Sequence, residues 1–562
     1  MEEHEENDGK RINRVNYPWE LDFRCPACNG KVKFCYSNPK HDYAGFDEDV
    51  EEYRYQYTCP NQDCTMHDVL FNPAPLDVLP RKRYSLAVWK WIAKEAKIYG
   101  QKPQQIVERL NHEFHVAITE STVRNYINEI DVYIAGKIDA NTMAMIQARG
   151  KVLLSLDGQE PDGTGPALWL FVDVISNRVL RIAILESADH ETLHQHVENM
   201  LSDYGVELIG IISDKQGSIV KMHDTFYPDI PHQYCHFHFL QNMWNHVELK
   251  DSHVHKELAK VINHLYITAA SKELHKRLEN GEKKKVRKVF EGVEKDLRKL
   301  VKGSSKKFDR LRGIEAFRKV EAYVSDMEQE CNKDDASRWV VKIMLKTVAQ
   351  IREQLDLLRP TMEDCVDLYK RFQDVRALLG NPQLAKAEKI ALLDGVFQST
   401  WEEASKNTDI SSKDELRTFL PKISSTRDEI LLEWVRLYES YRRGLFAYYD
   451  FPVDVRSIVD IEKKFGQEKM RLFTQCAKKN VGMQVRIRGP NILKELYAGK
   501  DEVKSILTEI DVDLDPEQLK AGLEEIASRT KAETSGWKSN IEGIEAIRRV
   551  LRFGKKDNFE GD

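Results

Sequence analysis

The sequence predicts a multidomain protein that joins α+β and α/β parts, and three observations lead to this fold class. The chain has 562 residues, which is too long for one hydrophobic core, so several domains are expected. Four cysteines form two close pairs near the N-terminus, which is typical of a small metal-binding module. Strand and helix patterns alternate over residues 151–250, and helical periodicity dominates residues 251–450. We therefore expect a mixed-sheet core that is interrupted by a large all-α insertion.

The composition is that of a globular protein, with 41% hydrophobic and 31% charged residues. No run of eighteen apolar residues occurs, so no transmembrane helix and no membrane partner are expected. The N-terminus reads MEEHEENDGK, which is neither a secretory signal nor a transit peptide. We expect a disordered tail over residues 1–20 and a cytoplasmic protein. The net charge of −6 argues mildly against a nucleic-acid-coated protein, but phosphate binding depends on local patches.

The paired cysteines predict a structural zinc site in residues 21–75. They form two knuckles about thirty residues apart, which suits a tetrahedral ion: Cys25, Cys28, Cys59 and Cys64. The aromatic alternation of VEEYRYQYT between the knuckles predicts a strand, which makes the module a zinc ribbon. Cys35 and His67 are alternative ligands, and four unrelated cytosolic cysteines are the plainer interpretation. A zinc ribbon indicates a binding module, but it names no chemistry.

Residues 81–140 predict three helices. An amphipathic helix covers residues 84–99, Pro103 opens a second helix, and Thr119 is the N-cap of a third. This order fits a helix-turn-helix domain, in which the start of the last helix meets DNA base edges. The residues that would do so here are Thr122, Arg124, Asn125 and Asn128. The alternative is a plain three-helix packing unit.

Residues 150–250 read as strand, strand, strand, helix, strand, helix, strand, helix. The first strand ends at Asp157 in KVLLSLDG, and the fourth ends at Asp214 in VELIGIISD. The crossover helix should make these two strands parallel neighbours at a topological switch point, where open sheets bind ligands. Two adjacent carboxylates repel each other unless a divalent cation lies between them, and oxygen ligands select Mg²⁺ or Mn²⁺. Alternatively, each aspartate is only a cap or turn residue; Asp173 and Asp162 are weaker metal candidates.

This stretch resembles the ribonuclease-H-like catalytic core of the DDE transposases, found in insertion sequences and Mutator-like elements. The resemblance rests on SLDG at Asp157, on IISDKQG at Asp214, and on a Cys-x-x-His signature formed by Cys235 and His238, with Asn242 following. It implies that Cys235 and His238 support the active site or contact DNA, because the two further ligands that zinc would need are not evident nearby. His232 and His236 are then polar strand or loop residues.

The DDE transposases that this stretch resembles complete their active site with a glutamate on a later helix, often in the pattern Glu-x-x-Phe. Glu462 and Phe465 match this pattern, within an expected closing segment at residues 451–490. The family often has asparagines just upstream, and FPVDVRSIVD lacks them, so Asp460 and Glu468 are alternatives. A charged helix without a special role is the plainer interpretation. Related transposases carry an all-α insertion before this helix, so the long helical segment at residues 251–450 is expected from the resemblance. Residues 491–562 should form a C-terminal helical region.

The resemblance implies a DNA transposase that cleaves phosphodiester bonds and transfers strands at the ends of a mobile element. Asp157, Asp214 and Glu462 would hold two Mg²⁺ or Mn²⁺ ions that activate the attacking oxygen and stabilise the leaving one. The expected partners are terminal inverted repeats and target DNA, bound by a homodimer associated with the nucleoid. A catalytically silent, domesticated DNA-binding protein and a ribonuclease-H-like nuclease without strand transfer are the alternatives. The basic run at residues 282–307 is by default a solvated helix face, with DNA-backbone contact as a second interpretation.

Overall fold

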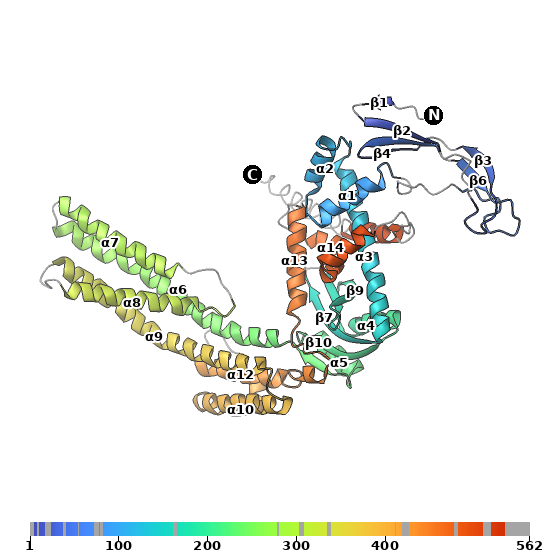
Figure 1. Ribbon diagram of the computed structural model, residues 1–562. Helices are drawn as coiled ribbons and strands as arrows, with labels where there is room; N and C mark the ends of the chain where they lie inside the picture. Colours follow the sequence, from blue (N-terminus) through green and yellow to red (C-terminus); the bar gives the residue numbers. More distant parts are fainter. Residues whose placement is uncertain are drawn as a thin grey trace, which may run out of the picture. The chain divides into compact units, whose positions relative to one another are not determined.

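The structure is a computed structural model that divides into two compact units, Met1–Ile209 with Val459–Asp562, and Gly210–Ile458 (Figure 1). It combines helices with a mixed sheet, which confirms the α+β part of the predicted fold class. Among the described helices, none has an apolar stretch long enough to cross a bilayer. The structure describes residues 5–7, 10–16, 24–37, 41–53, 55–71, 78, 82–160, 166–277, 280–302, 308–333, 339–410, 412–418, 426–476, 482–509 and 519–533.

Two small sheets make up the N-terminal part of the first unit. The four-stranded sheet has the order β1-β2-β5-β4 and contains β1 (Glu5–Asn7), β2 (Lys10–Asn16), β4 (His41–Ala44) and β5 (Glu48–Tyr53). The second sheet is an antiparallel pair of β3 (Lys33–Ser37) and β6 (Tyr55–Thr58). The expectation of disorder over residues 1–20 is wrong for β1 and β2. The polar composition of this segment predicted no order, but β2 gains backbone hydrogen bonds by pairing in parallel with the distant β5.

Three helices follow: α1 (Leu86–Lys97), α2 (Pro103–His112) and α3 (Glu120–Arg149). As predicted, Pro103 opens α2, and the Thr119 side chain caps α3 by accepting a hydrogen bond from the Thr122 N–H. α3 continues past residue 140, where the module was expected to end, because Ile146 continues its buried face. Gly150 ends the helix in the left-handed conformation that favours glycine.

The mixed sheet has the strand order β11-β10-β7-β8-β9. Its elements in chain order match the predicted series: β7 (Lys151–Gln159), β8 (Ala167–Asp173), β9 (Arg178–Leu185), α4 (His190–Tyr204), β10 (Glu207–Ser213), α5 (Gly217–Phe226) and β11 (His232–Tyr234). β8 pairs antiparallel with both β7 and β9, and β10 pairs in parallel with β11. The predicted hairpin turns at Asn177, whose φ of 54° is one that asparagine tolerates.

The first unit is completed by α13 (Val459–Cys476), α14 (Gly482–Ala498) and α15 (Lys500–Thr508). Val503 and Ile506 of α15 join the apolar core of α1, α2 and α3. A buried ion network joins the same elements, because the Lys97 ammonium of α1 pairs with Asp131 of α3 and Glu495 of α14. The helices after residue 458 are therefore built into the same core as the three helices near the N-terminus.

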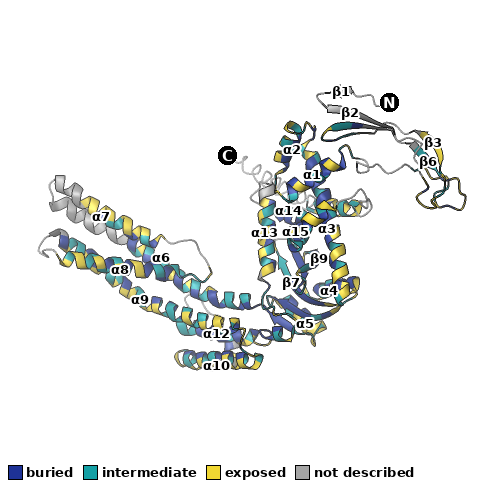
Figure 2. Cartoon of the chain, viewed as in Figure 1, coloured by how far each residue is buried: buried dark blue, intermediate teal, exposed yellow. Residues whose placement is uncertain are grey.

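The second unit is mainly helical, as predicted for residues 251–450. Its long helices are α6 (His236–Arg277), α7 (Asn280–Val301), α8 (Arg312–Asn332) and α9 (Trp339–Gly380), followed by α10 (Lys386–Ala404), α11 (Lys413–Thr418) and α12 (Arg427–Tyr441). One apolar core cluster extends through α6, α8, α9, α10 and α12. Figure 2 shows the described parts of these helices with buried stripes on one side and exposed stripes on the other.

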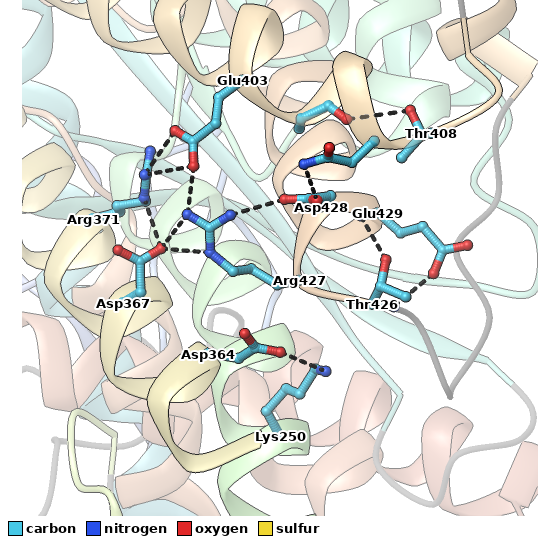
Figure 3. Close-up of polar contacts among 12 residues, drawn as sticks. Lys250, Asp364, Asp367, Arg371, Glu403, Thr408, Thr426, Arg427, Asp428 and Glu429 are labelled. Carbon is cyan, nitrogen blue, oxygen red and sulfur yellow. Dashed lines mark hydrogen bonds and ion pairs between the residues drawn. The ribbon is translucent and has the colours of Figure 1, made fainter. Parts of the chain in front are cut away.

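A charged cluster fastens α9, α10 and α12 to one another (Figure 3). The Arg427 guanidinium contacts Asp367, Glu403 and Asp428, and Arg371 contacts the first two of these carboxylates as well. Burial lowers the pKa of Arg427, but its hydrogen bonds to Glu403 and Asp367 outweigh this effect and raise it above its usual value. The shared, forked geometry makes this network more stabilising than isolated surface pairs.

Candidate active site

Asp157 lies near the end of β7 and is partly exposed. β7 runs two residues beyond it, to Gln159, so the prediction that the strand ends at Asp157 is wrong. The strand continues because β8 still offers pairing partners, with Gly158 opposite Trp169. A Cβ atom on Gly158 would lie 2.7 Å from the Trp169 ring, so this position needs glycine. The Asp157 carboxylate accepts a hydrogen bond of 2.9 Å from the Gly158 N–H.

β10 ends at Ser213, one residue before the predicted end of the strand, so Asp214 directly follows it; the Asp214 side chain is partly buried. Its carboxylate accepts a hydrogen bond of 2.9 Å from the Gln216 N–H, which forms a tight turn. Lys215, between them, has a φ of 70°, an uncommon conformation for a residue with a side chain. The Tyr441 hydroxyl donates to the Asp214 carbonyl at 3.4 Å, and the Lys215 ammonium lies 4.4 Å from the Tyr441 ring centre. These contacts fix the turn that carries the second predicted acid.

The first turn of α13 carries Asp460 and Glu462, of which Glu462 is partly exposed. Tyr497 of α14 is a buried residue whose hydroxyl is affected both by this turn and by Asp157 of β7. Burial raises the pKa of Tyr497, and the negative charges of Asp460 and Asp157 raise it further. Within the first unit, the start of α13 and the end of β7 therefore act on the same buried hydroxyl. Sequence reasoning did not single out Tyr497, because a tyrosine within a helical pattern gives no sign that distant aspartates act on its hydroxyl.

Glu468, the other alternative for the third acid, is fully buried. Neither of its carboxylate oxygens has a hydrogen-bond partner among the described residues. A Cβ atom on Gly489 of α14 would lie 2.0 Å from its Oε1 atom, which shows how closely α14 covers it. Burial raises the pKa of Glu468 to about 8. A neutral carboxyl group without access to solvent is a poor ligand for a catalytic cation, so Glu462 and Asp460 are the better candidates on α13.

The CHFH run lies where β11 gives way to α6, and Cys235 faces the protein interior. The Cys235 N–H donates to the Ser213 carbonyl at 2.8 Å, and its Sγ atom accepts from the Ile458 N–H at 3.4 Å. Burial raises the pKa of the Cys235 thiol, but hydrogen bonds with His238 and Ser457 outweigh this and lower it below its usual value. Cys235 and His238 thus interact with each other beside the strand that leads to Asp214.

The neighbouring histidines are buried rather than merely polar strand or loop residues. His232 lies in β11, and its Nε2 atom is 2.9 Å from the Ser213 Oγ atom. His236 is the first residue of α6, and its Nε2–H donates to the Leu445 carbonyl at 2.7 Å. Burial lowers the pKa of His232 to about 3 and that of His236 to about 4, so both rings are neutral at physiological pH. Their contacts fasten the CHFH run to its own unit.

The four paired cysteines come together as predicted. Their sulfur atoms lie within 4.8 Å of one another, which suits thiolate coordination of one zinc ion. The Cys25 and Cys64 sulfurs are 3.6 Å apart, as are those of Cys28 and Cys59. The alternative ligands Cys35 and His67 are not part of this group. Among the described residues, the carboxylates of Asp157, Asp214 and Glu462 do not form such a group. Asp214 belongs to the other compact unit.

Asp173 has a structural explanation. It is fully buried and accepts hydrogen bonds from the backbone N–H groups of Leu153 at 3.3 Å and Ser176 at 2.7 Å. It also pairs with the Arg149 guanidinium at 2.7 Å. These partners hold the β8–β9 turn, so Asp173 is not needed as a metal ligand. Asp162 lies outside the described residues.

The predicted DNA-contacting residues lie in the first three turns of α3. Arg124 and Asn125 are exposed, whereas Thr122 and Asn128 are partly buried. The Arg124 guanidinium pairs with Glu120 one turn earlier, so binding of DNA by Arg124 would have to displace this exposed ion pair. The surface position of Arg124 and Asn125 is compatible with contacts to base edges, and their DNA-binding role stays a prediction.

These features define an α+β protein with acids at the ends of sheet strands and a cysteine cluster suited to zinc. Residues 176–306 match the family described as Transposase, Mutator family. The matched segment begins in the β8–β9 turn and includes Asp214 and the Cys-x-x-His signature. This confirms the resemblance to a Mutator-like transposase that the motifs indicated. No curated protein matches the chain.

Proposed function

We propose that this chain is a DNA transposase that cleaves phosphodiester bonds and transfers strands at the ends of a mobile element in a metal-dependent reaction. The observation that carries the proposal is the Mutator-family match over residues 176–306. It covers the turn after β10 with Asp214 and the junction with Cys235. The strand order supports it further, because β7, which contains Asp157, and β10, which Asp214 directly follows, are neighbours in the sheet.

In this proposal Asp157, Asp214 and Glu462 hold Mg²⁺ or Mn²⁺ in a ribonuclease-H-like core. Carboxylate oxygens are the ligands that these cations prefer, and all three side chains are at least partly exposed. The bound cations would lower the pKa of the attacking hydroxyl and stabilise the leaving oxygen. The chain's own contribution is positioning. The Gln216 N–H orients the Asp214 carboxylate, and Tyr441 holds the backbone of the same turn.

DNA recognition would fall to the N-terminal modules. α3 would present Thr122, Arg124, Asn125 and Asn128 to the terminal inverted repeats, as the last helix of a helix-turn-helix does. The zinc ribbon would add a second contact to the same DNA. A homodimer would bring the two ends of the element together for strand transfer.

The test is cleavage of labelled duplexes that carry the element's own ends, with Mg²⁺, Mn²⁺ or chelator. Asp157→Asn, Asp214→Asn and Glu462→Gln should each abolish cleavage while end binding persists. Asp229→Asn is the matched control for Asp214, because Asp229 is an exposed acid of the same unit. Glu468→Gln is the control for Glu462 on the same helix and should retain cleavage.

The outcomes distinguish the candidate functions and identify the third acid. Cleavage without joining of a pre-cleaved end to target DNA would favour a nuclease without strand transfer. Tight end binding with no cleavage by the wild-type protein in either metal would favour a silent DNA-binding protein. Loss of cleavage in Asp460→Asn with retention in Glu462→Gln would move the third acid to Asp460.

A further inference from the structure

We propose that a groove between α7 and α8 binds the phosphodiester backbone of duplex DNA. The groove has a volume of about 530 Å³. Five of its lining residues are cations: Lys299, Lys302, Arg310, Arg312 and Lys319. This inference rests on the proposed function for the choice of DNA as the polyanion, whereas the positive charge of the groove is a property of the described residues.

The two acids that line the groove neutralise only part of the positive charge of its five cations. Glu315 is engaged by Arg310, whose guanidinium donates to both carboxylate oxygens at 3.2 and 3.1 Å. Asp296 accepts a hydrogen bond of 3.3 Å from the Tyr323 hydroxyl. By contrast, Lys299 and Lys302 are exposed and form no ion pair among the described residues. The groove therefore presents uncompensated ammonium groups to solvent.

Side chains rather than a helix end supply the attraction for an anion. The first backbone N–H groups of α8 are already occupied, because Gly313 and Ile314 both donate to the Asp251 carboxylate at 2.9 Å. Lys299 lies in the last turn of α7, and Lys302 directly follows the end of this helix. Phosphate charges follow one another along a DNA strand at intervals of about 3.4 Å of duplex axis, so a backbone lying in the groove offers phosphates to both of these long, exposed side chains.

The charge of this surface is local, because the whole chain has a net charge of −6. Non-specific attraction between an acidic protein and DNA is weak unless a patch of the opposite sign focuses it. The groove offers such a patch on helices that precede the closing segment with Glu462. Lysine and arginine bind phosphates without reading the base sequence. We infer that the groove holds DNA without sequence preference, while other modules recognise the ends.

The test measures the salt dependence of binding of the full chain to a short duplex of arbitrary sequence. The variant Lys299→Gln/Lys302→Gln/Lys319→Gln removes three of the groove charges. The matched control is Lys342→Gln/Lys346→Gln/Lys370→Gln, because these lysines are exposed on α9 of the same unit and lie outside the groove. Both triple variants change the net charge equally. Thermal unfolding of both variants should resemble that of the wild type, because all six positions are exposed.

Three phosphate contacts should contribute about 2.7 to the slope of log affinity against log salt concentration. The groove variant should lose that amount of slope, and the control should keep the wild-type slope. Equal slopes for both variants, whether reduced or unchanged, would overturn the proposal. Loss of binding to a poly-glutamate peptide, with unchanged duplex binding, would also overturn it and indicate an acidic protein partner. The readout is independent of cleavage, so failure of the transposase proposal would appear separately, in the Asp214→Asn comparison.

Discussion

The sulfur of Cys235 accepts a hydrogen bond from the backbone N–H of Ile458 at 3.4 Å, although the two residues are 223 positions apart in the sequence. Ile458 immediately precedes α13, which carries Glu462. Cys235 also donates its own N–H to Ser213, the residue before Asp214. One buried cysteine thus joins the strand of the second predicted acid to the segment that leads into the helix of the third. The CHFH run is a structural junction in this protein.

This junction predicts that Cys235→Ala destabilises the protein by about 1–2 kcal/mol, because the Ile458 N–H loses its acceptor in a buried place. Chemical denaturation would measure the change. The variant should keep its full zinc content, because Cys235 is not part of the four-cysteine cluster. Cys35→Ala is the control and should change the stability little, since Cys35 is exposed. Loss of zinc in Cys235→Ala would show that the CHFH run binds metal after all.

The cysteine cluster predicts one zinc ion per chain. Cys59→Ser should lose this ion, because four thiolates complete a tetrahedral site and three leave it open. Atomic absorption of the purified protein would measure the zinc content. Cys35→Ser should keep one zinc ion, since its sulfur lies outside the cluster. Equal zinc content in the two variants would contradict the assignment of the ligands.

The buried ion network predicts that Lys97→Met destabilises the first unit by about 1–3 kcal/mol. The substitution removes the ammonium group that Asp131 and Glu495 share and leaves each buried carboxylate with one guanidinium partner, Arg488 for Asp131 and Arg471 for Glu495. Hydrogen bonds to charged groups that are lost in a buried place are costly. Burial alone would raise the pKa of Asp131, but Lys97 and Arg488 lower it to about 2. Thermal unfolding would measure the loss.

Lys94→Met on the exposed side of α1 is the matched control and should change stability by less than about 1 kcal/mol. Adding Asp131→Asn and Glu495→Gln to Lys97→Met should cost less than the three single changes summed, because the first substitution has already broken the shared ion network. A triple variant as unstable as the sum of its single changes would show that packing, and not charge, explains the effect.

Glu468 predicts a stability that falls as pH rises from about 4.5 to about 8. Its pKa is about 8 in the folded protein and 4.5 in the reference state, so the folded state retains a proton that the unfolded state releases. Between these pH values the free energy of unfolding falls by up to about 1.4 kcal/mol per pH unit because of this group. Below pH 4.5 both states are protonated, and above pH 8 this loss is constant.

Glu468→Gln should remove this slope and raise stability at pH 8, because glutamine has a similar shape and carries no ionisable group. Denaturation midpoints at pH 5 and pH 8 would measure the difference. Glu462→Gln serves as the comparison on the same helix, since Glu462 is partly exposed. The same pH dependence in wild type and Glu468→Gln would refute the role of this carboxyl group.

The sequence alone was informative wherever structure depends on neighbouring residues. Thr119 was recognisable as a helix cap because a cap bonds to N–H groups two or three residues away. The order of strands and helices after residue 150 followed from hydrophobic periodicity, and the end of the fourth strand was predicted to within one residue of Asp214. The close spacing within each cysteine pair was sufficient to predict that the four sulfurs meet.

Only the tertiary structure decided the features that join distant parts of the chain. Local sequence does not encode that β2 pairs with β5, that α14 packs against Glu468, or that the charges of Asp157 and Asp460 raise the pKa of Tyr497. Periodicity shows that a face is buried, but it does not name the partner that covers it. The sequence thus determined the elements and the candidate acids, and long-range packing determined which acids remain accessible, because burial depends on residues hundreds of positions away.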